Sequence, residues 1–158
     1  MNRVAWTTGL IIITGLVIIQ FFRPERNTGG TQSTDDIQQV LQVPDTLALV
    51  LENSCFDCHS NHTRYPWYSQ IAPVSWYLAS HIRLGRDQLN LSEFGRLEKS
   101  RKIGALSDIC EMVEAGSMPL KSYLFIHRDA RISEKEAEAI CDWSESASLG
   151  ILRGDNPK

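Results

Sequence analysis

One short motif restricts this chain more than any other stretch: Cys55-Phe56-Asp57-Cys58-His59. It has the form C-x-x-C-H, which is the attachment signature of a c-type haem. Two thiols that add to the two vinyl groups of one porphyrin must lie a short turn apart, and the adjacent histidine can then reach the iron as an axial ligand. We therefore expect one covalently attached haem c, held by Cys55 and Cys58, with His59 as the proximal ligand.

Paired cysteines have two other common uses. A zinc site needs a second Cys/His pair at close spacing, and none follows this motif. A thioredoxin-like redox site needs a strand–helix–strand context, whereas the residues on both sides of the motif have helical patterns. A thiol–disulfide protein without haem stays open as an alternative at this point.

The longest apolar run covers residues 4–22, which are 19 residues without a formal charge. A run of that length can cross a bilayer, and no small-x-small cleavage pattern ends it. We expect residues 1–26 to be an uncleaved membrane anchor with a single transmembrane helix; a cleaved signal peptide is the alternative. Because bacteria attach haem c outside the cytoplasm, we expect a single-pass protein of the bacterial inner membrane with its haem domain in the periplasm.

The rest of the chain is acidic. From residue 27 onward it carries 13 of the 16 Lys and Arg residues and 18 of the 19 Asp and Glu residues, a formal charge of −5. Nucleic acid is therefore not an expected partner. The expected partners are haem, the membrane through the N-terminal helix, and periplasmic or membrane redox proteins.

The apolar pattern after the anchor is helical. Residues 27–43 are expected to be a linker, 44–150 the haem domain and 151–158 a tail. Helical periodicity predicts helices that begin near 44, 73, 101 and 133, with residues 86–95 as a loop. No strand pattern and no internal repeat is present. We expect an all-α, small cytochrome c-like domain of about four helices around one haem.

The second axial position of the iron needs a ligand or stays open. Met118 is the best candidate, because it follows a predicted helix and precedes Pro119 on a short loop. A methionine there could instead fill a gap in the core. His81 and His127 are the rival ligands, although a histidine on an apolar helix face, such as His81, is more often a hydrogen-bonded core residue.

Aromatic residues follow the motif closely in the stretch 60–68, Ser-Asn-His-Thr-Arg-Tyr-Pro-Trp-Tyr. We expect Tyr65 and Trp67, with Tyr68, to contact the porphyrin, and Arg64 to meet a propionate. The alternative is an ordinary surface loop held in place by its aromatic side chains.

Two further cysteines, Cys110 and Cys141, lie on the inward faces of the third and fourth predicted helices. Buried cysteines often remain free and pack as small apolar side chains. An oxidising compartment would instead favour a disulfide between the two helices. Both readings are open.

Three segments together resemble the bacterial haem-binding domain family: residues 55–82, 84–94 and 114–133, which contain the strings YPWYS, APVSW and MPL. The resemblance covers roughly residues 47–147. It implies a small helical c-type domain, often tethered to a membrane, with Cys55, Cys58 and His59 as attachment and proximal residues and Met118 as a plausible distal ligand. Cys110 and Cys141 are not part of that pattern.

These features predict a monohaem c-type cytochrome that carries electrons between redox partners and is not an enzyme. The alternative is a five-coordinate haem protein that acts as a peroxidase-like enzyme or as a sensor. Such a site needs an acid–base or hydrogen-bonding residue near the open position, and His81 or His127 could serve.

Overall fold

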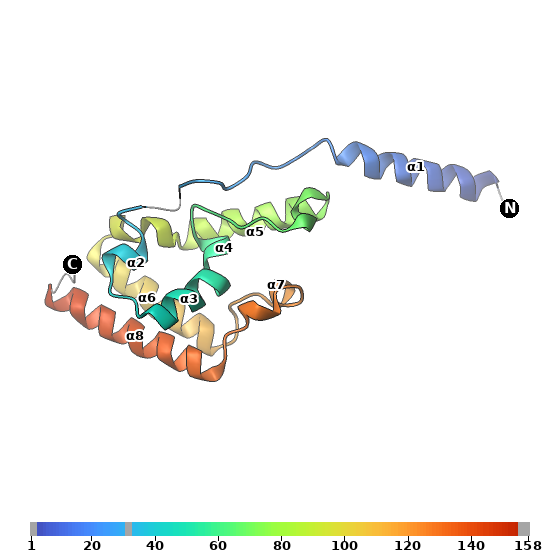
Figure 1. The fold of residues 1–158 in the computed structure, drawn as a ribbon. Coiled ribbons are helices and arrows are strands. Elements are labelled where there is room, and N and C mark those ends of the chain that lie inside the picture. Colours follow the sequence, from blue (N-terminus) through green and yellow to red (C-terminus); the bar gives the residue numbers. More distant parts are fainter. Residues whose placement is uncertain (1–2, 31–32, 155–158) are drawn as a thin grey trace.

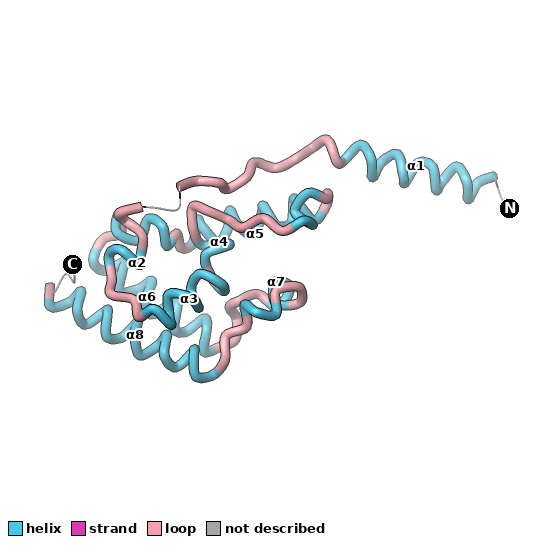
Figure 2. Tube along the Cα trace, viewed as in Figure 1, coloured by secondary structure: helices cyan, strands magenta, loops and turns pink. Residues whose placement is uncertain are grey.

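Helices form all of the regular structure in the computed structural model, which describes residues 3–30 and 33–154 (Figure 1). Within these ranges the only β-type pairing is an isolated bridge between Thr28 and His62, so the predicted all-α class is confirmed (Figure 2). Residues 1–2, 31–32 and 155–158, which were assigned to the anchor, the linker and the tail, lie outside the described residues. The elements in chain order are α1 (Arg3–Ile19), α2 (Ile37–Val40), α3 (Asp45–Ser54), α4 (Phe56–His59), η1 (Trp67–Gln70), α5 (Val74–Gln88), η2 (Leu91–Arg96), α6 (Lys99–Glu114), α7 (Lys121–Leu124), η3 (Arg128–Ala130) and α8 (Glu134–Arg153).

The main hydrophobic core forms around α6 and α8, which lie side by side (Figure 1). Leu106 of α6 and Ile140 of α8 are both fully buried in it. Trp143 of α8 also lies in this core, and its indole Nε1 donates a hydrogen bond to the backbone oxygen of Gln42, just before α3, at 3.0 Å. The same core includes buried side chains from α2, α3 and η2, so it joins these elements into one unit.

A disulfide also joins α6 to α8. Cys110 and Cys141 are bonded, and their Cα atoms are 4.7 Å apart. The two cysteines therefore do not remain free thiols, and of the two readings of this pair the disulfide is confirmed. The bond forms because each cysteine lies on the helix face that meets the partner helix.

The last helix begins as its sequence predicts. The side chain of Ser133 accepts a hydrogen bond from the backbone N–H of Glu136, and Glu136 in return accepts one from the N–H of Ser133, so the two residues form a capping box. The helix continues past Gly150, where we expected its end, and closes at Gly154 with a φ of 80°. It continues because Ile151 still packs against the core.

The predicted loop over residues 86–95 is wrong. Helix α5 runs on to Gln88, and η2 follows as a 3-10 helix. Asn90 caps η2 by accepting a hydrogen bond from Ser92 N–H at 3.1 Å. Leu91 and Phe94, three residues apart, are both buried. A spacing of three matches one turn of a 3-10 helix, which explains why this short element can bury two side chains on one face.

The expected membrane anchor over residues 1–26 is also wrong. Among the described residues, none of the helices combines the length and the apolar character that crossing a membrane requires. Helix α1 has 17 residues, so at 1.5 Å per residue it is only about 25 Å long, against about 30 Å for the hydrocarbon core of a bilayer. The predictions of a transmembrane helix, of the membrane as a partner and of a single-pass location in the bacterial inner membrane are corrected accordingly.

The segment that follows α1 is hydrogen-bonded to the helical domain. The side-chain amide of Gln20 exchanges two hydrogen bonds with the backbone of Ala72, at 2.9 and 3.1 Å. The side-chain amide of Asn27 donates to Ser60 O at 2.8 Å and to Thr63 Oγ1 at 2.9 Å. Residues 20–27 therefore lie against the loop that follows the C-x-x-C-H motif.

Candidate functional site

The C-x-x-C-H motif lies at the junction of α3 and α4. The backbone N–H of Cys55 donates to Leu51 O at 2.9 Å, and Cys55 O accepts from His59 N–H at 2.9 Å. Residues three and four apart in a helical turn share one face. This turn therefore presents Cys55, Cys58 and His59 on the same side.

Helix α5 packs closely on the motif, and a glycine makes this possible. A Cβ atom placed on Gly85 would lie 2.8 Å from Cys58 O, which is closer than real Cβ contacts allow. Any larger residue would push α5 away from α4. Gly85 therefore sets the distance between the motif and the helix beside it.

The imidazole of His59 is held in one tautomer. Its Nδ1 lies 3.0 Å from the backbone oxygen of Leu89. A carbonyl oxygen can only accept, so Nδ1 carries the proton and Nε2 of the neutral ring keeps a free lone pair. Histidines that bind metals in proteins are usually held in this way, through a hydrogen bond from the other ring nitrogen.

The two thiols of the motif are free. Burial, followed by the charges of Cys58 and Asp57 respectively, raises the pKa of Cys55 to about 12 and that of Cys58 to about 11. Thiol–disulfide enzymes depend on the opposite shift, because the thiolate is their reactive form. The environment of Cys55 and Cys58 is therefore unlike that of a redox-active thiol pair.

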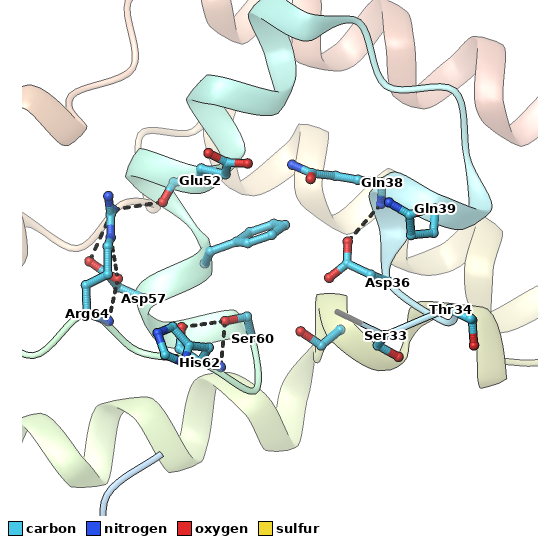
Figure 3. Close-up of a pocket in the computed structure, with 12 residues that line it drawn as sticks. Ser33, Thr34, Asp36, Gln38, Gln39, Glu52, Asp57, Ser60, His62 and Arg64 are labelled. Atoms are coloured by element: carbon cyan, nitrogen blue, oxygen red, sulfur yellow. Dashed lines mark hydrogen bonds and ion pairs between the residues drawn. The ribbon is translucent and has the colours of Figure 1, made fainter. Parts of the chain in front are cut away.

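Asp57, between the two cysteines, is a site residue that the sequence analysis missed. Its buried carboxylate accepts hydrogen bonds from Arg64 N–H and Arg64 Nε–H, both at 3.1 Å, and from the Tyr123 hydroxyl at 2.8 Å. Figure 3 shows the contacts with Arg64. A buried charge is costly unless such partners surround it. The one signal for Asp57 in the sequence is that an acidic residue lies inside the haem motif. The sequence does not show which distant groups form hydrogen bonds with it.

A line of aromatic groups continues from Asp57. Burial and the bond to Asp57 raise the pKa of Tyr123, so its phenol stays protonated and donates. The Tyr123 ring stacks on His127 with 4.3 Å between ring centroids. His127 Nε2 is in turn hydrogen-bonded to the Tyr68 hydroxyl at 2.6 Å. These contacts connect the motif, η1 and the segment around α7.

Met118 lies on the expected loop after α6. Gly116 ends the helix with a φ of 62°, a backbone conformation that glycine adopts at the ends of many helices. The backbone N–H of Met118 bonds to Met112 O at 3.1 Å, and the Met118 side chain is half-buried while Pro119 is buried. Met118 and His127 thus belong to one segment, residues 118–127, which we call the distal loop.

His81, the other rival ligand, lies on α5. Its Nδ1 is 2.9 Å from Tyr77 O, one turn earlier in the same helix, and its ring faces Tyr77 with 4.1 Å between centroids. The ring is therefore tied to its own helix through Nδ1.

Tyr65 and Trp67, predicted to contact the porphyrin, have different surroundings. The Tyr65 hydroxyl accepts a hydrogen bond from Asn27 N–H at 2.7 Å, and the Arg26 guanidinium lies over its ring at 4.7 Å. Trp67 is 77% exposed. The predicted propionate ligand Arg64 is bonded to Asp57, as described above.

Two exposed apolar residues near this site were also missed. Phe125 is 81% and Ile126 57% exposed, and both directly precede His127. Trp67, which precedes Tyr68, is exposed as well, so large apolar side chains adjoin both residues of the Tyr68–His127 contact in the sequence. Such groups are typical of surfaces that contact a ligand or another protein.

A cavity of about 660 Å³ lies on another side of α4. Its lining includes Phe56, Asp57 and Ser60 from the motif region, Asp36 just before α2 and Gln38 in α2 (Figure 3). Cys55, Cys58 and His59 do not line it. This cavity is therefore separate from the face that carries the thiols and the imidazole.

The residues present fit a c-type haem. Two free thiols stand one turn apart, and the adjacent imidazole has the tautomer that binds a metal. The haem-binding domain family matches residues 14–146, which is most of the chain. No curated protein and no solved structure matches it. The chain belongs to the haem-binding domain family and is a haem protein.

Proposed function

We propose that the protein is a monohaem c-type cytochrome that carries electrons, with Cys55 and Cys58 as the covalent attachment points and His59 as the proximal ligand. The observation that carries this proposal is the 3.0 Å contact between His59 Nδ1 and Leu89 O. It orients the ring and leaves Nε2 free beside two thiols on the same turn. A hydrogen bond of this kind also makes the ligating nitrogen more basic.

Each residue of the motif has a distinct task in this proposal. Cys55 and Cys58 supply the two thioether bonds, and the close contact of Gly85 with Cys58 O keeps their turn rigid. His59 supplies one axial nitrogen. When bound, haem supplies an iron centre that takes up and releases one electron. The chain then serves to orient that centre, to limit its access to water and to set its potential.

Met118 is the proposed distal ligand. Its side chain is half-buried on a loop that begins at the end of α6, and the same loop is bonded to the motif through Tyr123. A thioether ligand raises the potential of a haem relative to a second imidazole. Trp67 is still proposed to contact the porphyrin. The proposed electron-transfer partners of the protein are other redox proteins.

A second candidate function is a five-coordinate haem enzyme or sensor. The hydrogen-bonded pair Tyr68–His127 favours it, because an acid–base group is what an open distal position needs. In that case His127 would act as the acid–base residue and Met118 would be a packing residue.

Absorption spectra of the purified protein in both oxidation states decide between the two. A carrier with Met118 as ligand is six-coordinate and low-spin, and its oxidised form has the weak far-red sulfur-to-iron band. Met118→Ala should abolish that band and open the iron to carbon monoxide, whereas His81→Ala and His127→Ala should leave the band in place. A high-spin wild-type protein that binds carbon monoxide readily would support the second candidate instead.

A further inference from the structure

We propose that Asp57 and Tyr123 form a latch that positions the distal loop, residues 118–127, on the haem motif. The proposal rests on the proposed function, because this loop carries two of the candidate distal ligands, Met118 and His127. Asp57 and Tyr123 are thus positioning residues, and neither is proposed to bind the iron.

The acceptor side of the latch is rigid. The Asp57 side chain is 12% exposed and paired with Arg64. Its backbone oxygen accepts a hydrogen bond from Thr63 Oγ1 at 2.7 Å, and Arg64 N–H donates to its Oδ1 at 3.1 Å. Its other carboxylate oxygen, Oδ2, accepts the hydrogen bond from the Tyr123 hydroxyl at 2.8 Å and a longer one from Arg64 Nη2 at 3.5 Å.

The distal loop has little apolar packing of its own. Pro119 and Ala130, near its two ends, are buried, but no residue of α7 between them is buried. Phe125 and Ile126 point to solvent. A segment with few buried apolar contacts opens easily unless polar contacts hold it. The position of the loop therefore depends on its hydrogen bonds.

Among these hydrogen bonds the latch is the charged one. Two other tyrosine hydroxyls contact the loop: that of Tyr77 donates to Ser122 Oγ at 3.2 Å, in an exposed neutral contact, and that of Tyr68 is hydrogen-bonded to His127 Nε2 at 2.6 Å. The Tyr123 hydroxyl donates to a carboxylate that is partly buried. Hydrogen bonds to ionised acceptors are roughly twice as strong as neutral ones. Loss of the Tyr123 hydroxyl should therefore loosen the loop at its centre even though the Tyr68–His127 contact remains, whereas loss of the Tyr77 hydroxyl should have little effect.

The test compares two matched variants of the haem-loaded full chain, Tyr123→Phe and Tyr77→Phe. Each loses one hydroxyl that links the distal loop to another part of the domain, and each keeps its ring. Carbon monoxide binding to the reduced protein should become about tenfold faster in Tyr123→Phe, because an open loop exposes the iron. It should change less than about twofold in Tyr77→Phe. Amide hydrogen exchange at residues 123–127 should accelerate in the same order.

Haem content and thermal stability are measured on the same samples. These measurements distinguish a change in the position of the distal loop from a general loss of structure. Asp57→Asn is the second variant. If Tyr123→Phe does not bind haem, Asp57→Asn tests whether the Asp57–Tyr123 hydrogen bond positions the loop. The amide of Asn can still accept the Tyr123 hydrogen bond but carries no charge. The rate of carbon monoxide binding in Asp57→Asn should therefore lie between the rate of wild type and that of a protein with an open loop.

The outcomes separate the two proposals. A six-coordinate wild-type protein whose Tyr123→Phe variant matches Tyr77→Phe in carbon monoxide rate and hydrogen exchange overturns the latch and leaves the electron carrier intact. A wild-type protein that is already high-spin and open overturns the carrier, and with it any latch for a distal ligand. Faster binding and exchange in Tyr123→Phe alone supports both.

Discussion

Two regions of the molecule differ in the interactions of their buried side chains: the helix pair α6 and α8, and the region around the haem motif. Between α6 and α8 the buried residues are apolar, such as Leu106 and Ile140, and a disulfide adds a covalent link. Around the motif the fully buried side chains are mostly polar, while the aromatic ones are half-buried, as Tyr68 and Tyr123 are, or exposed, as Trp67 and Phe125 are. The buried polar residues in that region are Asp57, Ser60, Thr63 and Ser69.

This difference separates stability from orientation. Apolar burial supplies most of the driving force for folding but has no preferred direction. Hydrogen bonds contribute less net free energy but fix distances and angles. In this protein the helix pair therefore serves as the scaffold, and the polar contacts of Asp57, His59 and Tyr123 determine how the site is presented.

The largest expected effect is on the scaffold. Leu106→Ala removes a fully buried side chain and should lower the free energy of unfolding by about 2–5 kcal/mol. Met112→Ala in the same helix, where the side chain is 42% exposed, should change it by less than about 0.5 kcal/mol. Chemical denaturation measures both. Equal losses in the two variants would contradict apolar burial as the source of the scaffold's stability.

Removal of the disulfide comes next. The cysteines are 31 residues apart in the chain, and a link that closes a loop of this size contributes about 2–4 kcal/mol. The variant Cys110→Ser with Cys141→Ser should lose that amount in thermal or chemical denaturation. Reductant should destabilise wild type to the same level and leave the variant unchanged. A wild type that is insensitive to reductant and has alkylatable thiols at both positions would rule the link out.

A smaller effect is expected from the ion pair beside the motif. Arg64 contacts the buried Asp57 at 3.1 Å, whereas Arg83 and Asp87 are exposed and 3.9 Å apart. Arg64→Ala should cost about 1–2 kcal/mol, because it removes the hydrogen bonds that Nε and Nη2 donate to a buried carboxylate, while the backbone N–H bond remains. Arg83→Ala should cost less than about 0.5 kcal/mol. If Arg64→Ala and Arg83→Ala lose the same stability in thermal denaturation, the polar contacts of the motif contribute no more than ordinary surface contacts.

The smallest effect concerns pH and the scaffold. Hydrogen bonds from Ser133 lower the pKa of Glu136 below its usual value of 4.5. A lowered pKa in the folded state means that the ionised form stabilises the fold above the unfolded pKa, and that this contribution disappears as the pH falls through the folded value. Glu136→Gln should reduce stability at neutral pH by less than about 1 kcal/mol and should flatten this part of the pH profile. If stability falls with pH in the variant as it does in wild type, the capping box is not the source of this pH dependence.

The sequence predicts some parts of this molecule well because their signals are local. The attachment motif is contiguous, and the start of α8 follows from a capping box. Contacts between distant segments leave no such signal. Asp57 and Tyr123 are 66 residues apart, so periodicity cannot report their bond. The wrong anchor has a different cause: an apolar run shows composition but not where its helix ends, and α1 ends at Ile19.

The most direct test of the central claim is the intact mass of the purified protein under denaturing conditions. Thioether bonds survive denaturation, whereas axial ligands do not. The proposal predicts the mass of the chain plus one haem, with no alkylation at Cys55 or Cys58, and loss of this added mass when both are changed to Ala. The mass of the chain alone, with both thiols open to alkylation, would contradict it.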